Sequence, residues 1–304
     1  LYQLKLEEKY GNDCIVLLMV GSFYEIYGLN TEECSFGKVE KVSKILNILM
    51  TRKDKSKKHS ISNPYLCGFP VHSIGKHLHK LLSHKFTVAI YDQFDIENSK
   101  KKTRKLVHIY SPSTYIDSEI LENNDLMAIY IESYYCPLQK ALIKSCYIAS
   151  IDLSTGKNRV FTCSDTRENP NKVEEEIVRI VYMINPCEIL IDGDDNIKKK
   201  FEGKLVHSKK INKKFLNIDY QNNFIQKVFG KDPYMSPIES INLEKYNDLC
   251  ACYLFLLQFA YEHDSRIIKR IQKPEFVDSS ANIIINNDAL LQLNLLNNND
   301  IKSK

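Results

Sequence analysis

The sequence predicts an α/β protein with two mixed α/β domains followed by the start of a helical domain. Over residues 1–112, short apolar runs typical of strands alternate with amphipathic helix patterns. Over residues 113–235, three strand-like runs follow one another and lead into a helix, a strand and a second helix. Over residues 236–304 the pattern changes to long helix. We therefore expect domain boundaries near residues 112 and 235, with the third domain truncated.

Composition excludes several classes of protein. The chain of 304 residues is long enough for two or more domains with real cores, and 43% hydrophobic residues are usual for a globular protein. No run approaches the length of a membrane span, and no signal peptide opens the chain, so no membrane association is expected. Because the chain begins at Leu1 in mid-pattern, we expect the numbering to start inside a longer protein.

Charge and cysteine content bear on nucleic-acid binding and on the cellular compartment. The 42 basic against 38 acidic residues leave a net charge of +4, which alone is too slight to indicate nucleic acid binding. The 9 cysteines are odd in number and show no paired CxxC spacing, which favours an intracellular, reducing compartment. Nucleus, cytoplasm, organelle and viral factory all satisfy that condition. No metal site is predicted.

The first domain is expected to open with a polar helix and then to mix strands and helices. Gly37 interrupts the second helical pattern, and Ser73 is a favourable N-cap for the third. The expected elements are helix 1–10, strand 15–20, helix 31–47, strand 48–53, strand 63–68, helix 74–82, strand 86–91 and strand 106–110.

The second domain follows a linker rich in Ser, Asp, Glu and Asn over residues 113–125. The turn 154–157 joins two of its strands, and Pro170 is expected at the first position of its first helix. Its expected elements are strands 126–134, 141–153 and 158–163, a helix to residue 184, strand 187–191 and helix 220–229. Three antiparallel strands, a helix and a parallel strand are typical of ribonuclease-H-like folds. An apolar helix then ends near His263.

The stretch from Met19 to Tyr27 is the leading candidate site. An apolar strand-like run ends at Gly21, and two aromatic residues and an acid follow at Phe23, Tyr24 and Glu25. Such a run delivers an exposed ring from a rigid support. In the alternative interpretation, the rings are core residues at the start of a helix and Glu25 is a solvated first-turn acid. These residues alone leave both interpretations open.

Four separated blocks resemble motifs of the MutS family of DNA mismatch-repair proteins, in the same order and spacing. Residues 21–27 resemble Gly-Asp-Phe-Tyr-Glu-Leu-Phe, and residues 67–72 resemble Cys-Gly-Val-Pro-Tyr-His. Residues 88–93 resemble Val-Ala-Ile-Cys-Asp/Glu-Gln, and residues 111–114 resemble Ser-Pro-Gly-Thr. The resemblance implies that residues 1–112 are a mismatch-recognition domain.

Further stretches extend the resemblance along the chain. Residues 151–156 are similar to the motif that opens the MutS connector domain, which has a ribonuclease-H-like fold without its nuclease. Residues 283–295 resemble the entry into the helical core and lever. Ser22, Val71 and Ser113 depart from the usual Asp, Tyr and Gly, and Gly-Ser at the first motif resembles the branch found in large viruses and organelles.

The resemblance assigns roles to Phe23 and Glu25. It implies that Phe23 wedges into the minor groove beside a mispaired base and that Glu25 hydrogen-bonds that base. A minor groove offers a degenerate set of acceptors, but it reports how easily a base step unstacks. Unstacking costs a few kcal/mol per step, and less where the pairing is already poor. A carboxylate beside phosphates is disfavoured, so we hypothesise that Glu25 is neutral or shares a proton in the bound state.

Two basic clusters lie within the same domain, around residues 52–58 and 100–105. They are either phosphate contacts or solvated loop tips, and the sequence leaves both open. The candidate phosphate contacts are Arg52, Lys53, Lys55, Lys57, Lys58, Lys102 and Arg104.

A rival function is a metal-dependent nuclease of the ribonuclease-H type. Asp152 and Asp192 end two predicted strands, where such an enzyme holds carboxylates for two metal ions. Turn capping is a sufficient explanation for Asp152, because it precedes a Ser-Thr-Gly turn. A protein-interaction module without DNA selectivity is a second rival.

The sequence contains no Gly-x-x-x-x-Gly-Lys-Ser/Thr loop, so we expect these residues to have neither catalytic residues nor a cofactor. The resemblance implies that the full-length parent is an ATP-dependent dimeric clamp that uses ATP and magnesium. It also implies three partners: double-stranded DNA with mismatches or small loops, a second MutS-type subunit, and a MutL-type protein that meets the connector domain.

Overall fold

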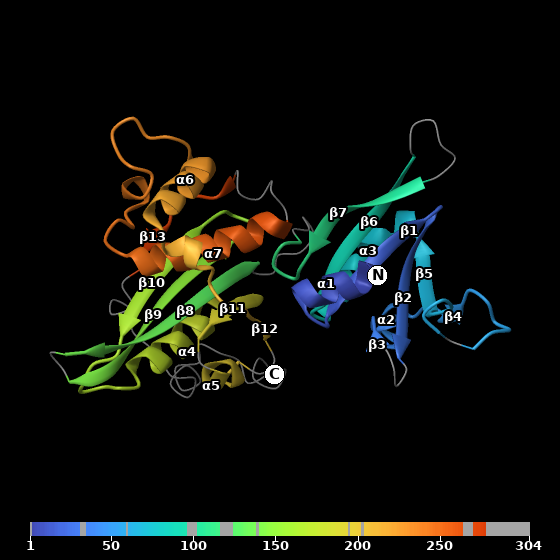
Figure 1. The fold of residues 1–304 in the computed structure, drawn as a ribbon, viewed down its shortest axis with the longest axis horizontal. Coiled ribbons are helices and arrows are strands. Elements are labelled where there is room, and N and C mark those ends of the chain that lie inside the picture. The colour runs from blue at the N-terminus through green and yellow to red at the C-terminus, as the bar shows by residue number, and fades with distance from the viewer. Residues whose placement is uncertain are drawn as a thin grey trace, which may run out of the picture.

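The computed structural model describes residues 2–30, 35–58, 60–95, 102–115, 124–137, 140–193, 195–201, 204–263 and 270–277. These residues form two separate mixed sheets, each covered by helices on both faces (Figure 1). The predicted α/β class is therefore confirmed. In the described parts of the chain, no helix is long and apolar enough to cross a membrane.

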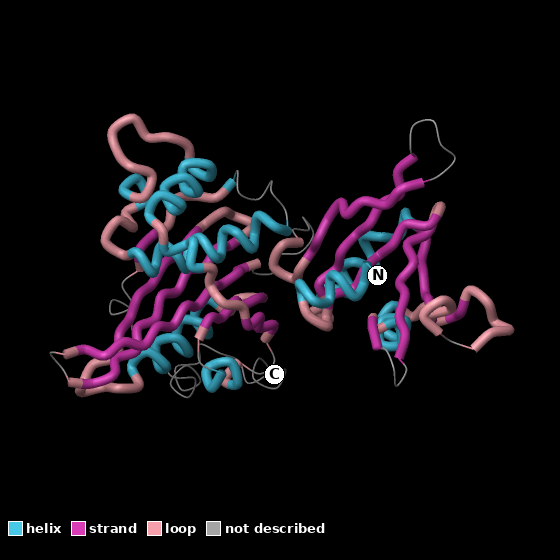
Figure 2. Tube along the Cα trace, viewed as in Figure 1, coloured by secondary structure: helices cyan, strands magenta, loops and turns pink. Residues whose placement is uncertain are grey.

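The first sheet has the strand order β4-β5-β2-β1-β6-β7, and β3 pairs with β2 (Figure 2). Strand β1 is antiparallel to β2 and parallel to β6, so the central strand has partners on both edges. The strands are β1 (Cys14–Val20), β2 (Phe23–Asn30), β3 (Ser35–Phe36), β4 (Thr51–Arg52), β5 (Tyr65–Pro70), β6 (Thr87–Asp95) and β7 (Lys102–Tyr110).

The continuous apolar run of β1 reflects burial on both faces of the sheet. Ile15 and Leu17 pack toward α2 (Val39–Leu46) and α3 (Ile74–Ser83), whereas Cys14 and Val16 pack toward α1 (Tyr2–Tyr10). A strand covered on both sides needs apolar residues at every position rather than at alternate ones. The predicted first helix, first strand and third helix are present at these places.

The second predicted helix is shorter than expected. It was expected over residues 31–47 but begins at Val39, and β3 lies within the expected range. Gly37 has a backbone φ of 63°, and a Cβ atom there would clash with the carbonyl oxygen of Tyr27. Because Gly37 has this left-handed backbone conformation, which glycine adopts without strain, the helix cannot extend back through residue 37.

Two further local expectations need correction. The strand expected over residues 48–53 is reduced to Thr51–Arg52. Ser73 occupies the N-cap position of α3, but its side chain makes no capping hydrogen bond. Ser73 instead ends a short 3-10 turn, η1 (Val71–Ser73), that leads into the helix.

The second sheet has the order β12-β11-β8-β9-β10-β13. Its three antiparallel strands and the parallel β11 confirm the predicted order, whereas β12 and β13 were not expected. The assignment to a ribonuclease-H-like fold stays a prediction. The strands are β8 (Asp125–Cys136), β9 (Ala141–Asp152), β10 (Asn158–Ser164), β11 (Glu188–Asp192), β12 (Leu205–Ser208) and β13 (Glu275–Phe276).

Helices cover the two faces of this sheet in separate groups (Figure 1). One face packs against α4 (Lys172–Ile184) and α5 (Asp195–Lys199). The other packs against α7 (Asn247–His263), with α6 (Ile218–Phe229) beside it. The 3-10 turns η2 (Lys213–Leu216) and η3 (Glu239–Ile241) complete this side.

Helix α4 begins two residues after the expected Pro170. Asn171 holds the N-cap position, and the Asp165 carboxylate accepts a hydrogen bond of 2.8 Å from the N–H of Val173 in the first turn. An acidic group at a helix N-terminus satisfies a free N–H and interacts favourably with the helix dipole. Asp165, the first residue after β10, therefore helps to decide where the helix starts.

The expected boundary at residue 236 does not coincide with a break in packing. Residues along α7 share one hydrophobic core with Leu126, Ala128 and Ala149 of the second sheet. Strand β13 also pairs in parallel with β10. Residues 237–263 and 270–277 thus pack with the second sheet, and residues 283–295, expected to enter a helical core, lie outside the described residues.

A buried polar cluster joins the two sheets. The hydroxyls of Ser111 and Ser113, just after β7, donate to Oε2 of Glu188 on β11, and Nε2 of His207 lies 2.7 Å from its Oε1. Nearby, Lys9 of α1 forms a 3.4 Å ion pair with Glu262 of α7. The start of the predicted linker is therefore a packed junction rather than a free connection.

Candidate nucleic-acid interface

Phe23 lies at the tip of the β1–β2 hairpin, and three hydrogen bonds from neighbouring segments hold this tip. The N–H of Gly21 donates to the Gln93 side chain at 3.0 Å, and Nε of Arg104 donates to the Met19 carbonyl at 2.9 Å. The N–H of Val71 donates to the Ser22 carbonyl at 2.9 Å. The hairpin tip is therefore fastened to the β6–β7 side and to the β5 side of the sheet.

The Phe23 ring is exposed. It retains 45% of its accessible surface, whereas Tyr24, the next residue, is buried on the face covered by α2 and α3. Successive strand residues point to opposite faces, which explains this contrast. The alternative in which this segment starts a helix is wrong, because Phe23 opens an eight-residue strand. The wedge role of Phe23 stays a prediction, and an exposed ring on a held turn is what it requires.

Glu25 lies on the same face of β2 as Phe23, two residues further along. It is half-buried and accepts a hydrogen bond from the hydroxyl of Tyr27. Glu25 is opposite Gly68 of β5, where an added Cβ would lie 3.5 Å from the Glu25 Cγ atom and 2.8 Å from the Tyr24 carbonyl oxygen. Gly68 of the second motif thus makes room for the strand that carries Glu25.

The two arginines among the expected phosphate contacts are engaged in holding the chain. Arg104 bonds to Met19 as described, and Arg52 donates to the Lys57 carbonyl at 2.9 Å. The Arg52 guanidinium also lies 6.0 Å from the centre of the Tyr65 ring. Both arginines therefore stabilise the segments around them. The clustering of basic residues in the sequence could not distinguish this role from a phosphate contact.

The lysines of the same clusters are mostly at the surface. Lys53, Lys55, Lys57 and Lys58 are exposed, although Lys57 also pairs with Asp54 at 3.3 Å. Lys102 pairs with Asp95 at 3.8 Å. Lys100 and Lys101 lie outside the described residues.

The basic loop between β4 and β5 is organised by Asn63, which the sequence interpretation missed. The Asn63 amide donates to the carbonyls of Asp54, Lys57 and Lys58 at 2.9, 3.3 and 3.3 Å. An Asn immediately before a proline was the available signal, since Asn side chains commonly bond to nearby backbone in turns. The loop projects from the first sheet (Figure 2), and its four lysines are exposed.

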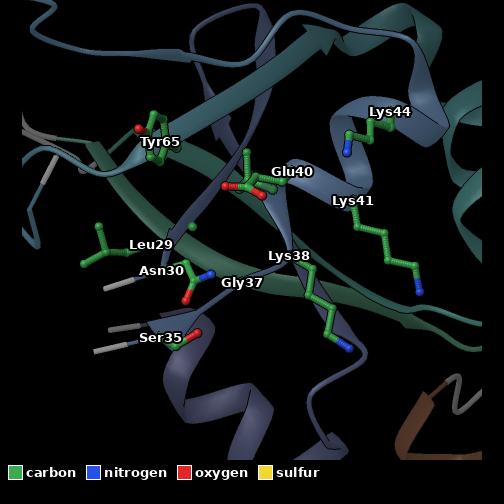
Figure 3. Close-up of a pocket in the computed structure, with 11 residues that line it drawn as sticks. Leu29, Asn30, Ser35, Gly37, Lys38, Glu40, Lys41, Lys44 and Tyr65 are labelled. Atoms are coloured by element: carbon green, nitrogen blue, oxygen red, sulfur yellow. The ribbon is translucent and has the colours of Figure 1, made fainter. Parts of the chain in front are cut away.

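A polar pocket of about 370 Å³ lies at the start of α2 and also includes three lysines, but it is a poor anion site (Figure 3). Lys38 bonds to Asp13 at 2.6 Å, and the Lys41 ammonium lies 5.0 Å from the centre of the Phe86 ring. Both lysine side chains extend away from Glu40, whose carboxylate also lines the pocket (Figure 3). The candidate interface therefore remains on the hairpin tip and the basic loop.

The two acids of the rival nuclease interpretation both accept hydrogen bonds from the protein. Asp152 accepts from the hydroxyls of Ser154 and Thr155, which is the expected turn capping, and Asp192 accepts a 2.7 Å bond from the N–H of Ile211. Within the described ranges, no group of three or more His, Cys, Asp and Glu side chains is placed to hold a metal ion.

Comparison with known proteins agrees with the geometry. The family model of MutS domain I matches residues 2–119. A putative DNA mismatch repair protein mutS homolog of Acanthamoeba polyphaga mimivirus is 24% identical over 99% of this chain and 29% of its own length. DNA mismatch repair protein MutS of Clostridioides difficile is 27% identical over 93% of this chain and 27% of its own length.

A third relative, MutS of Thermodesulfovibrio yellowstonii, is 33% identical over 66% of this chain and 20% of its own length. The chain thus spans less than a third of each of these relatives. The matched domain contains the exposed Phe23, the hydrogen-bonded Glu25 and the basic loop. Residues 2–119 match MutS domain I, and most of the chain is similar to DNA mismatch repair proteins of the MutS family, which together support its assignment as a MutS mismatch-recognition fragment.

Proposed function

We propose that this chain recognises mismatched double-stranded DNA in DNA mismatch repair, with Phe23 as the wedge in the minor groove and Glu25 as the hydrogen-bonding partner of the mispaired base. The observation that carries the proposal is the exposed Phe23 ring at a hairpin tip held from both sides. The similarity to DNA mismatch repair proteins supports the coarser part of the proposal, a role in mismatch repair.

A held tip suits a wedge for an energetic reason. Inserting a ring between base steps costs a few kcal/mol of unstacking. If the tip were mobile, binding would also cost the entropy of ordering it. Because hydrogen bonds from β6, β7 and the end of β5 already order the tip, more of the binding energy is available for distorting the duplex. A mismatched step is easier to distort, so it is preferred.

For the whole protein we propose the activities that the family resemblance implies. These are ATP hydrolysis with magnesium, pairing with a second MutS-type subunit into a clamp, and contact with a MutL-type partner through the domain expected over residues 113–235. Acting in a reducing intracellular compartment belongs to the same proposal. These activities have their own tests, and the DNA experiment below does not depend on them.

The test of the proposed function is a comparison of two duplexes that differ by one base. Fluorescence anisotropy should show tighter binding of this chain to a duplex with one mismatch or one unpaired base than to the perfectly paired duplex. Absolute affinity should be weak and should fall steeply with salt. Equal affinity for both duplexes would favour the protein-interaction module, and Mg²⁺-dependent cleavage that disappears in Asp152→Asn would favour the nuclease.

Removing exposed lysines of the basic loop should weaken binding without changing selectivity. In the triple variant Lys53→Ala, Lys55→Ala and Lys58→Ala, we expect affinity for mismatched and perfect duplexes to fall by the same factor. The slope of log affinity against log salt should decrease by about 0.9 for each phosphate that the variant no longer neutralises. Replacing the exposed Lys227, Lys231 and Lys245 of the second sheet region is the matched control. An unchanged salt slope in the loop variant would show that these lysines are solvated tips.

A further inference from the structure

Phe23, Glu25 and Tyr27 share one face of β2, while Tyr24 and Ile26 are buried on the other face. On a strand, residues i and i+2 lie about 6.6 Å apart along one face, so a tyrosine reaches a neighbouring carboxylate. The Tyr27 hydroxyl donates to Oε2 of Glu25. The other carboxylate oxygen of Glu25, Oε1, accepts no hydrogen bond from any residue that the structure describes.

The Tyr27 ring is itself held in place. It is half-buried and lines an apolar pocket of about 220 Å³ together with Leu18, Phe36 and Pro64. Burial raises the pKa of the Tyr27 hydroxyl well above its ordinary value, and the neighbouring Glu25 carboxylate raises it further. Tyr27 therefore keeps its proton and remains a donor at every pH used for DNA binding.

We propose that Tyr27 is a specificity-determining residue, which holds one carboxylate oxygen of Glu25 and leaves the other oxygen of that carboxylate to meet the mispaired base. The proposal rests on the proposed function and adds how the Glu25 carboxylate is oriented toward the base. A free carboxyl rotates and offers either oxygen to several base edges, whereas a held one offers a single oxygen in one direction. The first motif quoted above ends in Phe, so the hydroxyl belongs to this chain rather than to the usual form of the motif.

The experiment is Tyr27→Phe, which removes only the hydroxyl. The ratio of affinities for mismatched and perfect duplexes should fall about three- to tenfold, the usual effect of one hydrogen bond. Affinity for the perfect duplex and the melting temperature should stay unchanged. Because Tyr27 acts through Glu25, the same substitution in a Glu25→Ala background should have no further effect on the ratio, which a double-mutant cycle measures.

The matched control is Tyr24→Phe. It removes the same atom from the same strand, but the Tyr24 hydroxyl bonds to Asp92 at 2.6 Å on the opposite face. Selectivity in Tyr24→Phe should equal that of the wild type.

Three results would overturn the assignment. A wild-type ratio in Tyr27→Phe refutes it and leaves the proposed function standing. An equal loss from Tyr27→Phe with and without the Glu25 side chain shows that Tyr27 does not act through Glu25. If the wild-type chain has no mismatch preference, the proposed function fails and the role of Tyr27 fails with it.

Discussion

Phe23→Ala should abolish the preference for mismatched DNA while leaving affinity for perfectly paired DNA within about twofold. Stacking of an aromatic ring on a base contributes about 1–3 kcal/mol by alanine substitution, so the loss at a mismatch should be about 5- to 150-fold. The perfect duplex resists the wedge and is bound through its phosphates, so it should lose little. Competition anisotropy with both duplexes at one salt concentration measures the ratio directly.

Phe94 provides the matched control for this substitution. It is 44% exposed, against 45% for Phe23, but it lies on β6 with the Lys105 ammonium 5.9 Å from the centre of its ring. Phe94→Ala removes the same amount of exposed aromatic surface from the same sheet and should retain the mismatch preference. A retained preference in Phe23→Ala, or an equal loss in both variants, would show that Phe23 is not the wedge.

Glu188→Ala should have the largest effect on stability, lowering the free energy of unfolding by about 3–5 kcal/mol, as expected when one member of a buried charged cluster is removed. The Glu188 side chain is fully buried, and its carboxylate accepts from Ser111, Ser113 and His207. Without it, the buried hydroxyls of Ser111 and Ser113 and the partly buried His207 ring lose their charged acceptor. Urea unfolding measures the loss, and Glu188→Gln, which keeps the shape and one acceptor oxygen, should lose less. Wild-type stability in Glu188→Ala would contradict the role of this cluster.

The same carboxylate predicts a particular acid sensitivity. Burial alone would raise the pKa of Glu188, but hydrogen bonds from His207 and Ser111 and Coulombic interactions with His207 and His263 lower it from 4.5 to about 2. A depressed carboxyl pKa adds stability that is complete above pH 4.5 and is lost as the pH falls from about 4.5 to about 2. The stability of Glu188→Ala should therefore decline less steeply over this interval than that of the wild type.

This cluster also explains the fourth motif. Ser111 and Ser113 belong to the block that resembles Ser-Pro-Gly-Thr, and both are buried against a carboxylate of the other sheet. In this chain Ser111, together with Ser113 where the usual motif has Gly, therefore serves the junction between the sheets rather than the candidate DNA interface. Since β11 carries Glu188, these two hydroxyls contribute to the junction between the two sheets.

Elements with a long local pattern were predictable from the sequence. Strands β8, β9 and β10 carry alternating or continuous apolar residues over seven to twelve positions, and α7 is rich in apolar residues along its length. The spacing of apolar residues was therefore sufficient to predict these elements. Strand β2 was not predictable in the same way, because Phe-Tyr-Glu-Ile-Tyr fits the start of a helix or a strand. Its pairing with β1 and β5 selects the strand, since both partners supply backbone hydrogen bonds.

What the sequence by itself determined is the α/β class, the order of most elements, the resemblance to the MutS family and the choice of Phe23 and Glu25. These follow from short-range period and from motifs of a few residues. Only the tertiary structure decided that Phe23 is exposed, that Arg104 holds the hairpin and that Glu188 meets two serines. The pairs Arg104 with Met19 and Glu188 with Ser111 are separated by 85 and 77 residues. Such contacts form only when distant segments are brought together in the folded sheets, so no local pattern encodes them.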